Sequence, residues 1–229
     1  YISIRSNITD TKQLEKINIV YIIDGLGMGG AERLMVPILK YLNRDLFQPR
    51  VCVLQNKDGN PMEKELLALG VPVDHLPIPY LRDLTAINRL RLYLKSVNAS
   101  LVHTQLEFAN IFGNIAAKLS KLPSVSTIHT MPAQNISRKM KVHQTLEMIT
   151  LRYFCEKVIS VSEEAGLHHL RIGYSRSEQI QTIYNGIDLS TYNELDRITC
   201  TTSVRAEFNL PASAKIIITV AVLRELKGI

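Results

Sequence analysis

Apolar and polar positions alternate in blocks along this chain, and the blocks predict its secondary structure. Seven short, nearly continuous apolar runs are separated by longer stretches whose apolar residues recur at helical spacing. A short run without internal alternation is typical of a strand that is buried on both faces. The runs lie at residues 16–24, 50–55, 71–76, 100–104, 124–129, 157–161 and 179–184.

The intervening stretches carry the start and stop signals of helices. Pro61 opens a predicted helix that Gly70 ends, and Asp83 lies where it can cap the next one. Regular succession of strand and helix predicts an α/β fold, a Rossmann-like doubly wound parallel sheet with right-handed crossovers. The expected helices lie at residues 30–43, 61–70, 84–97, 107–121, 140–155 and from 162 onward.

The alternation weakens toward the end of the chain, which indicates a domain boundary. We expect a polar leader at residues 1–15, the Rossmann-like domain at 16–188 and a linker with one short helical stretch at 189–214. Residues 215–223 predict a new buried strand, and a lone strand has no sheet to join. We therefore expect residues 215–229 to be the first strand of a second, truncated domain.

Composition narrows the class of protein. Hydrophobic residues make up 46% of the 229 residues, enough for a packed core, yet no apolar run reaches the roughly 18 residues of a membrane span. Three scattered cysteines without C-x-x-C spacing predict reduced thiols in a cytoplasmic protein. The net charge of +6 suits a polyanionic ligand or an acidic surface. Nucleic acid is a poor candidate, because only 6% of the residues are aromatic and no recognition motif is present.

A glycine cluster follows the first predicted strand. The stretch DGLGMGG at residues 24–30 matches G-x-G-x-x-G, a pattern of NAD-binding domains. NAD would require an acid at the end of the second strand, where the sequence has Gln55-Asn56, and Asp24 would lie beside the pyrophosphate. We therefore favour a sugar diphosphate or its sugar, lying against Gly29 and Gly30 at a helix N-terminus. A tight turn without a ligand is the alternative.

Ligands of doubly wound sheets bind beyond the carboxyl ends of the strands, and polar residues lie at these ends here. His129 could donate a hydrogen bond to a sugar hydroxyl, or it could be a structural cap. His103 could contact an acceptor, with a contact to the following helix as the equal alternative. Asp24 is a candidate acceptor-side carboxylate, although capping of the glycine loop's own N–H groups is the favoured explanation.

Several stretches together resemble the N-terminal domain of a family 4 (group 1) glycosyltransferase of the GT-B fold. They are GMGGAERL, SLVHTQ, TIHT, VISVSEEA, YNGIDLSTY and VAVLRELKG, in a specific order over residues 17–229. The resemblance implies two Rossmann-like domains across a cleft, the first for the acceptor and the second for most of a nucleotide-sugar donor. It implies glycosyl transfer with retention, without metal or other cofactor, in the synthesis of a cell-surface polysaccharide or glycolipid.

The resemblance also implies roles for single residues. Gly29 and Gly30 correspond to the loop that approaches the donor's diphosphate and sugar. His129, with Thr130 beside it, corresponds to the histidine that contacts the transferred sugar, and Lys227 to a lysine on the donor phosphates. The other matched positions lie in the family's S-E motif and in its N-G-x-D motif near the hinge: Ser162, Glu163, Asn185, Gly186 and Asp188.

Two departures from the family pattern change the expectation. Val222 stands where the family has an arginine on the donor phosphates, and Arg224 is the candidate replacement. The family's E-x7-E region of the second domain is absent, so we expect this chain alone to be inactive or nearly so. Two alternatives stay open: a GT-B-like UDP-sugar epimerase, and a Rossmann module that binds a nucleotide or acceptor without catalysis.

A basic segment precedes the predicted helix at 140–155. Arg138, Lys139 and Lys141 lie there, followed by apolar residues at helical spacing. One interpretation is a peripheral contact with anionic lipid at the inner face of the plasma membrane, which would bring the protein to a lipid-linked acceptor. The other, which we favour, is a core-facing helix with a solvated basic start.

Overall fold

The computed structural model describes residues 15–57, 59–83, 85–132, 137–189 and 204–219. The chain divides into two compact units, residues 1–187 and 188–229.

The first unit contains seven strands and the helices that connect them. The strands are β1 (Ile17–Ile23), β2 (Phe47–Val53), β3 (Val73–His75), β4 (Leu101–Gln105), β5 (Ser124–Ile128), β6 (Lys157–Ser160) and β7 (Ile180–Thr182). The helices are α1 (Gly30–Lys40), α2 (Glu63–Ala68), α3 (Thr85–Ser96), the π-helix η1 (Ala109–Gly113), α4 (Asn114–Leu119), α5 (Arg138–Tyr153) and α6 (Glu163–Arg171).

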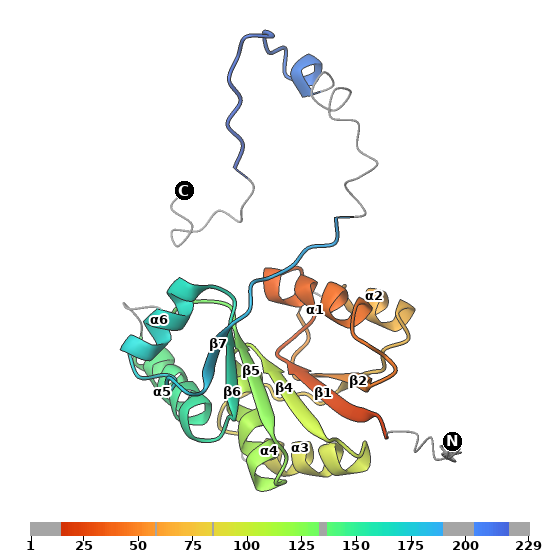
Figure 1. Cartoon of the computed structure of the whole chain (residues 1–229), viewed down its shortest axis with the longest axis vertical. Coiled ribbons are helices and arrows are strands. Elements are labelled where there is room, and N and C mark those ends of the chain that lie inside the picture. Colours follow the sequence, from red (N-terminus) through yellow and green to blue (C-terminus); the bar gives the residue numbers. More distant parts are fainter. Residues whose placement is uncertain (1–14, 58, 84, 133–136, 190–203, 220–229) are drawn as a thin grey trace, which may run out of the picture. The chain divides into compact units, whose positions relative to one another are not determined.

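The strands form one sheet in the order β3-β2-β1-β4-β5-β6-β7, and every neighbouring pair is parallel (Figure 1). Parallel neighbours need a crossover connection, which the helices between the strands supply. The predicted Rossmann-like α/β fold is therefore confirmed, with element boundaries within a few residues of those expected.

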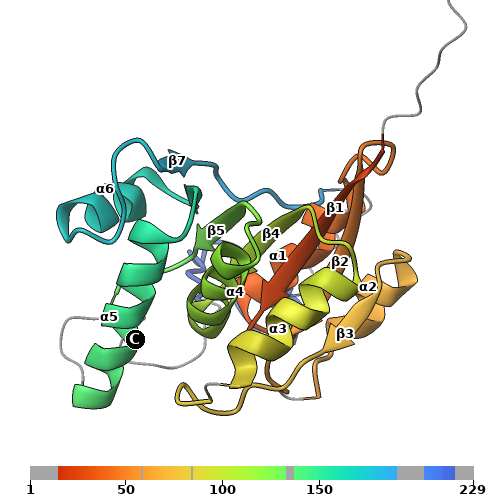
Figure 2. The ribbon, with the colours of Figure 1, turned by 90° about the horizontal axis from the view of Figure 1, so that it is seen from below.

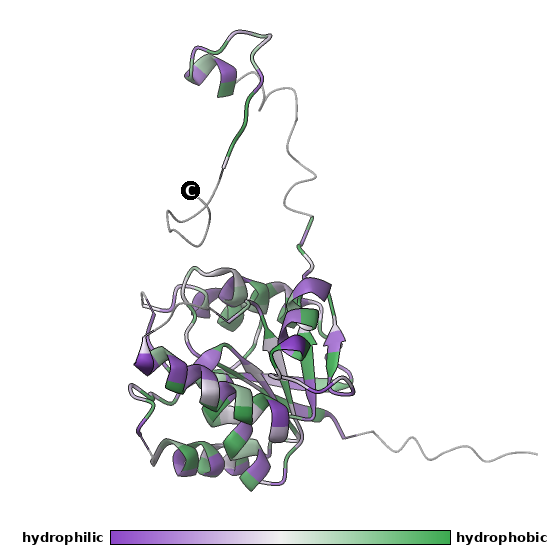
Figure 3. Ribbon diagram, turned by 90° about the vertical axis from the view of Figure 1, so that its left-hand side faces the viewer, coloured by the Kyte–Doolittle hydropathy of each residue, from purple (hydrophilic) through white to green (hydrophobic). Residues whose placement is uncertain are grey.

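Side-chain alternation along β1 gives the sheet a core on each face. Tyr21 and Ile23 point to the layer of α1 and α2, whereas Val20 and Ile22 point to the layer of α3, η1 and α4. Figure 2 shows α3, α4 and α5 along one face of the sheet. A strand that is buried on both faces needs apolar residues at every position, which explains the continuous runs in the sequence. The helices carry hydrophobic and hydrophilic residues together, as Figure 3 shows.

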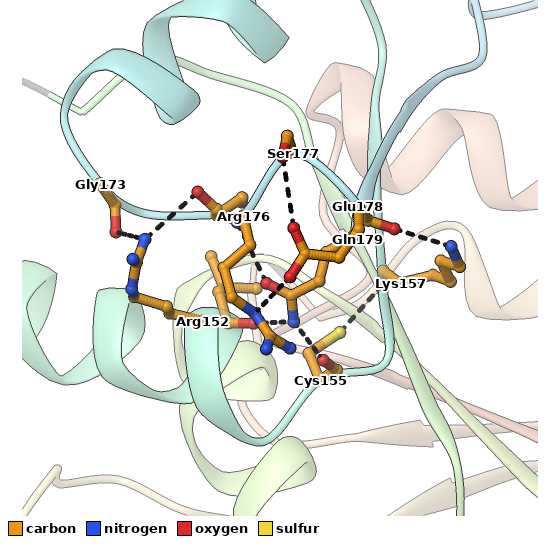
Figure 4. Close-up of polar contacts among 10 residues, drawn as sticks. Arg152, Cys155, Lys157, Gly173, Arg176, Ser177, Glu178 and Gln179 are labelled. Atoms are coloured by element: carbon orange, nitrogen blue, oxygen red, sulfur yellow. Dashed lines mark hydrogen bonds and ion pairs between the residues drawn. The ribbon is translucent and has the colours of Figure 1, made fainter.

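The amino-terminal ends of β6 and β7 are fixed by polar contacts near the end of α5 (Figure 4). The Gln179 side chain donates to the carbonyl of Cys155 at 2.6 Å, and Lys157 Nζ donates to the carbonyl of Glu178 at 2.8 Å. Gln179 is only 2% exposed. Its side-chain amide supplies hydrogen bonds to buried backbone carbonyls that have no partner within the sheet. Polar residues at this edge of the sheet therefore have a structural explanation.

Two predicted elements differ from the structure. β4 continues to Gln105, so His103 lies within the strand and not at its end. The helix predicted at 107–121 begins as η1 and continues as α4. Gly113 allows this wide turn to lie close to β4, because a Cβ there would be 2.6 Å from the Thr104 methyl group.

The second unit contains a helical turn at residues 204–207, within the predicted linker. Residues 215–219, the described part of the predicted strand, are not a strand, and Ile217 is 94% exposed. Val222, Arg224 and Lys227 lie outside the described residues. No helix in the described part of the chain is long and apolar enough to cross a bilayer.

Candidate functional site

The direction of the crossovers reverses between β1 and β4, which are neighbours in the sheet. Doubly wound sheets bind ligands at such a switch point, beyond the carboxyl ends of the strands. Two segments meet this edge: residues 24–30 after β1, here called the glycine loop, and residues 106–108 after β4. A cavity of about 770 Å³ lies at the opposite edge of the sheet, around the amino-terminal ends of β1 and β2.

The glycine loop is held from behind by the segment after β2. Asn60 Oδ1 accepts hydrogen bonds from the backbone N–H groups of Leu26 and Lys57, each at 3.0 Å. The Met62 N–H donates to the Leu26 carbonyl at 3.1 Å. Asn60 is buried with φ of 52°, a conformation that asparagine tolerates better than most residues. The Leu26 amide is thus engaged by the protein itself.

Gly29 and Gly30 have different surroundings. A Cβ on Gly29 would collide with the carboxylate of Glu32, whose Oε1 lies 3.8 Å from Lys57 Nζ. A Cβ on Gly30 would meet nothing within 4 Å. Gly30 is also the first residue of α1, where backbone N–H groups lack helical partners. A side chain at position 29 would require the carboxylate of Glu32 to move, whereas position 30 faces open space at a helix N-terminus.

His129 directly follows β5 and contacts the last residue of β4. Its Nε2 lies 2.7 Å from Gln105 Oε1. Burial lowers the pKa of His129, and the negative charge of Glu32 acts in the opposite direction. The imidazole is therefore neutral near pH 7 and lies within electrostatic reach of the helix that the glycine loop opens.

Two further side chains share the face of the sheet on which His129 lies. His103 Nε2 is 2.8 Å from Thr127 Oγ1, and its ring centroid is 5.0 Å from that of Tyr21. Burial lowers the pKa of His103 to about 4, so this ring is neutral as well. Because alternate residues of a strand point to one face, β4 and β5 together present His103, Gln105, Thr127 and His129. We call these four residues the histidine face.

His103, Thr127 and His129 line a cavity of about 350 Å³. The rest of its lining is mainly apolar and comes from α1, β6 and the segment after β7: Leu34, Pro37, Ile38, Tyr41, Ile159, Val161, Ile183, Tyr184, Asn185, Gly186 and Ile187. A hollow with apolar walls and a few convergent polar groups is typical of a small-molecule site. The structure thus brings together three residues predicted from the sequence, His103, His129 and Asn185.

Asp24 lies at the same edge of the sheet, but it does not cap the N–H groups of the glycine loop, the role favoured from the sequence. Its carboxylate accepts backbone hydrogen bonds from Phe108 at 3.2 Å and Ala109 at 2.7 Å, in the turn after β4. These two N–H groups follow β4, the strand next to β1, so Asp24 connects the two strands on either side of the switch point. Asp24 is 6% exposed, and burial raises its pKa to about 6. It joins the two loops of the site.

The opposite face of β4 carries a set of hydrogen-bonded polar residues. Thr104 Oγ1 lies 2.7 Å from Asn110 Oδ1 and 2.6 Å from Ser126 Oγ. Asn114 Nδ2 donates to Ser126 at 2.9 Å, and Asn110 Nδ2 donates to Glu147 on α5 at 2.8 Å. Burial raises the pKa of Glu147 to about 7. We call these five residues the buried polar network.

The remaining predicted site residues lie around this edge. Ser162 caps α6, with Oγ accepting from the Ala165 N–H at 3.2 Å, so the predicted N-cap is confirmed. Glu163 is exposed, and a hydrogen bond to its carboxylate raises the pKa of Tyr184. The Thr130 carbonyl lies 3.3 Å from His169 Nε2. No cluster of potential metal ligands occurs among the described residues.

Sequence reasoning missed three residues of the site. Gln105 had a usable signal, because it lies two positions after His103 in a strand and so shares its face. Glu32 also had one, since an acid at the third helical position commonly reaches back to the helix start. Asn60 had none, because it meets Leu26 across 34 residues of sequence.

The structure is a Rossmann-like domain with a cavity and several candidate site residues at the carboxyl edge of its sheet. Residues 28–191, more than half of the chain, match the model of the family described as Glycosyltransferase Family 4. The chain belongs to this family.

Two curated relatives are similar to this chain. The capsular polysaccharide biosynthesis glycosyltransferase CapH of Staphylococcus aureus is 24% identical over 182 residues, which are 78% of this chain and 49% of CapH. The putative glycosyltransferase EpsF of Bacillus subtilis (strain 168) is 22% identical over 182 residues, 76% of this chain and 46% of EpsF. The chain thus spans about half the length of the curated relatives it matches.

Solved structures share the fold. The Anabaena protein Alr3699/HepE, crystallised in complex with UDP, superposes with a TM-score of 0.68 at 20% identity, over 84% of this chain and 50% of that one. A UDP-GlcNAc 2-epimerase of Methanocaldococcus jannaschii reaches a TM-score of 0.53 at 16% identity, over 84% and 52% of the two chains. The chain therefore shares its fold with HepE and with a UDP-GlcNAc 2-epimerase.

Proposed function

We propose that this chain forms the acceptor-side domain of a glycosyltransferase that moves a sugar from a nucleotide-sugar donor to a saccharide or lipid-linked acceptor. The observation that carries the proposal is His129, held beside the helix of the glycine loop and lining a cavity at the carboxyl edge of the sheet. The UDP complex of HepE and the role of CapH in capsular polysaccharide biosynthesis support the donor class and the pathway class.

The neutral imidazole of His129 suits contact with a sugar. It can hydrogen-bond a hydroxyl without placing a full charge near the anomeric carbon, which becomes positive during transfer. The first turn of α1 supplies backbone N–H groups and the positive end of a helix dipole. Because Gly30 has no side chain and faces open space, a phosphate or sugar can approach these groups closely.

The apolar cavity suits the acceptor. His103 and Asn185 supply polar contacts in a lining that is otherwise mostly aliphatic and aromatic. We propose retention of the anomeric configuration. The acceptor hydroxyl oxygen bonds to the anomeric carbon while the bond between the anomeric carbon and the diphosphate oxygen breaks. The proton of the acceptor hydroxyl passes to the departing diphosphate oxygen. Lys227 is proposed to contact the donor phosphates.

The test uses the full-length protein encoded by the gene that contains these 229 residues. It is incubated with UDP- or GDP-sugars and oligosaccharide acceptors, and product and free nucleotide are measured. Transfer should depend on acceptor, and His129→Ala should reduce it by about 100-fold, the usual cost of losing a positioned group near developing charge. Unchanged transfer by the variant would remove His129 from the site.

An epimerase is the second candidate, because a UDP-sugar epimerase shares the fold. It would convert a UDP-sugar without any acceptor, so a change in the sugar of the recovered nucleotide in acceptor-free reactions would favour it. Apolar cavity walls favour the transferase, since an epimerase has no second, lipid-linked substrate to bind.

We also propose that the start of α5 can contact an anionic membrane surface. Arg138, Lys139 and Lys141 are exposed, with Met140 exposed between them and Val142 exposed directly after them. Cations with interspersed apolar side chains suit the interface of an anionic bilayer. Reversal of the three charges should weaken binding to phosphatidylglycerol vesicles, and unchanged binding would rule the contact out.

The matched control reverses three exposed cations elsewhere on the same unit, Arg91, Lys95 and Lys121. It changes the net charge equally, so equal loss in both variants would indicate a general charge effect and not a surface on α5.

A further inference from the structure

Gln105 is fully buried, and one end of its side-chain amide has no protein partner. Its Oε1 contacts His129 Nε2 at 2.7 Å. Its Nε2 forms no hydrogen bond with any described residue. A buried N–H without a partner costs free energy, and native structures rarely keep one without a reason.

The backbone beside Gln105 is fixed by a strained turn. Leu106 has φ of 76°, in the left-handed region that leucine seldom adopts. Such residues persist where the surrounding structure determines them. Immediately afterwards, the N–H groups of residues 108–109 bind Asp24, while Gln105 itself pairs with β1 on one side and β5 on the other. The direction of the Gln105 side chain is thus determined from both sides.

The contact with Gln105 decides which nitrogen of His129 carries the proton. In the orientation that the structure gives the Gln105 amide, its oxygen faces His129 Nε2, and because a carbonyl oxygen only accepts, Nε2 is the donor in this arrangement. Because burial keeps this ring neutral near pH 7, Nδ1 then has a free lone pair. Among the described residues, the hydrogen bond found for the His129 ring is the one to Gln105 through Nε2, and the ring lines the cavity.

We propose that Gln105 is a positioning residue that holds His129 as the Nε2–H tautomer, so that Nδ1 accepts a hydrogen bond from a hydroxyl group of the bound sugar. The identity of the ligand rests on the proposed function, whereas the tautomer is a property of the chain alone. A sugar with a hydroxyl at that point is selected over its deoxy analogue, because only the hydroxyl can donate to Nδ1.

The tautomer is read directly from the imidazole nitrogen shifts of the chain labelled with ¹⁵N-histidine. The chain contains 6 histidines, and the His129 signals are those lost in His129→Ala. At pH 7.5, a value about one unit above the ordinary pKa of histidine, His129 should show a protonated Nε2 and a bare Nδ1. A protonated Nδ1 in the unmodified chain would overturn the inference.

Two variants of Gln105 separate positioning from packing. Gln105→Met keeps the length of the side chain but replaces the amide oxygen by a sulfur that accepts only weakly, so His129 should become a mixture of tautomers. Gln105→Glu still accepts from Nε2–H, so the tautomer should persist and the pKa of His129 should rise beside the new carboxylate. If Gln105→Met does not fold, the titration of Gln105→Glu decides alone, and an unshifted pKa contradicts the proposal.

Gln179→Met is the matched control, because Gln179 is an equally buried glutamine at the other edge of the sheet. It should lower stability and leave the His129 tautomer unchanged. A change of tautomer in this control would mean that general loosening, and not the lost acceptor, alters His129.

Transfer measurements with the whole protein then connect the tautomer to function. Gln105→Met should lower kcat/KM about 10-fold, the scale of one lost hydrogen bond, and the same variant should lose the preference for the hydroxyl sugar over the deoxy analogue. If the nitrogen shifts agree with the proposal but His129→Ala transfers normally, the tautomer stands and the proposed function fails. If His129→Ala is inactive but Gln105→Met keeps one tautomer, the proposed function stands and the positioning role fails.

Discussion

Thr104 and Gln105 are adjacent in β4, yet they belong to polar regions of different kinds. Gln105 lies on the histidine face, where the neighbouring side chains line a cavity of about 350 Å³ and one amide N–H has no described partner. Thr104 lies in the buried polar network, where η1, α4 and α5 cover the sheet and hydrogen bonds connect side chain to side chain. The two faces of one strand thus separate residues available to a ligand from residues that hold helices on the sheet.

The difference teaches how to distinguish function from structure in a buried polar residue. Both regions are largely shielded from water, so burial alone does not separate them. Access to a hollow does, because His103, Thr127 and His129 line the cavity of about 350 Å³, whereas no residue of the buried polar network lines it. The following changes test this distinction in order of expected effect.

The largest effect is expected on activity at the histidine face. His129→Ala should reduce sugar transfer by about 100-fold, while the free energy of unfolding falls by no more than about 1–2 kcal/mol, because the ring lines a cavity and its loss leaves one atom, Gln105 Oε1, without its partner. His75→Ala is the control, because this exposed histidine lies in the edge strand β3 and pairs with Glu63. A large loss of stability in His129→Ala would place His129 with the structural residues.

The next effect is expected on stability in the buried polar network. Thr104→Val keeps the shape of the side chain but leaves Asn110 and Ser126 without a shared hydroxyl, so stability should fall by about 1–3 kcal/mol. Chemical denaturation measures this, and transfer by the folded variant should be near normal. Thr145→Val removes an exposed hydroxyl of α5 and should cost less than about 0.5 kcal/mol. Equal losses in the two variants would contradict a special role for the network.

These residues also show how far the sequence could go. The doubly wound sheet was predictable, because strands buried on both faces leave continuous apolar runs, and so was the position of His129 and the glycine loop at its carboxyl edge. The assignment of His103 to a strand end was wrong by two residues, since β4 continues to Gln105. The partners of Asp24 were not predictable, because they lie 84 and 85 residues away and are backbone N–H groups without a sequence signature.

The third effect concerns the pH dependence of the network. The pKa of Glu147 rises from an ordinary 4.5 to about 7 in the folded protein. Between these values the folded state binds more protons than the unfolded state, so stability falls as pH rises through this window. Glu147→Gln retains an acceptor for Asn110 but cannot ionise. It should therefore exceed the unmodified protein in stability by about 1–2 kcal/mol at pH 8, a figure reduced for partial exposure, with the advantage vanishing near pH 4.5.

Unfolding curves at pH 4.5, 6 and 8 measure this dependence, with Glu164→Gln, an exposed change on α6, as the control. An advantage of Glu147→Gln that is constant with pH would assign the effect to packing and not to ionisation.

The smallest effects are expected at the glycine loop, where the neighbouring residues Gly29 and Gly30 have different surroundings. Gly29→Ala should lower stability by about 1 kcal/mol, because its methyl group meets the Glu32 carboxylate and this side chain must move away from Lys57. Gly30→Ala should change stability by less than about 0.5 kcal/mol, since its methyl group enters open space at the start of a helix. If that space belongs to a ligand, Gly30→Ala should nevertheless raise KM for the nucleotide sugar several-fold. A variant at position 30 with unchanged KM would mean that the open space is solvent, and that close approach of a ligand to the start of α1 does not occur.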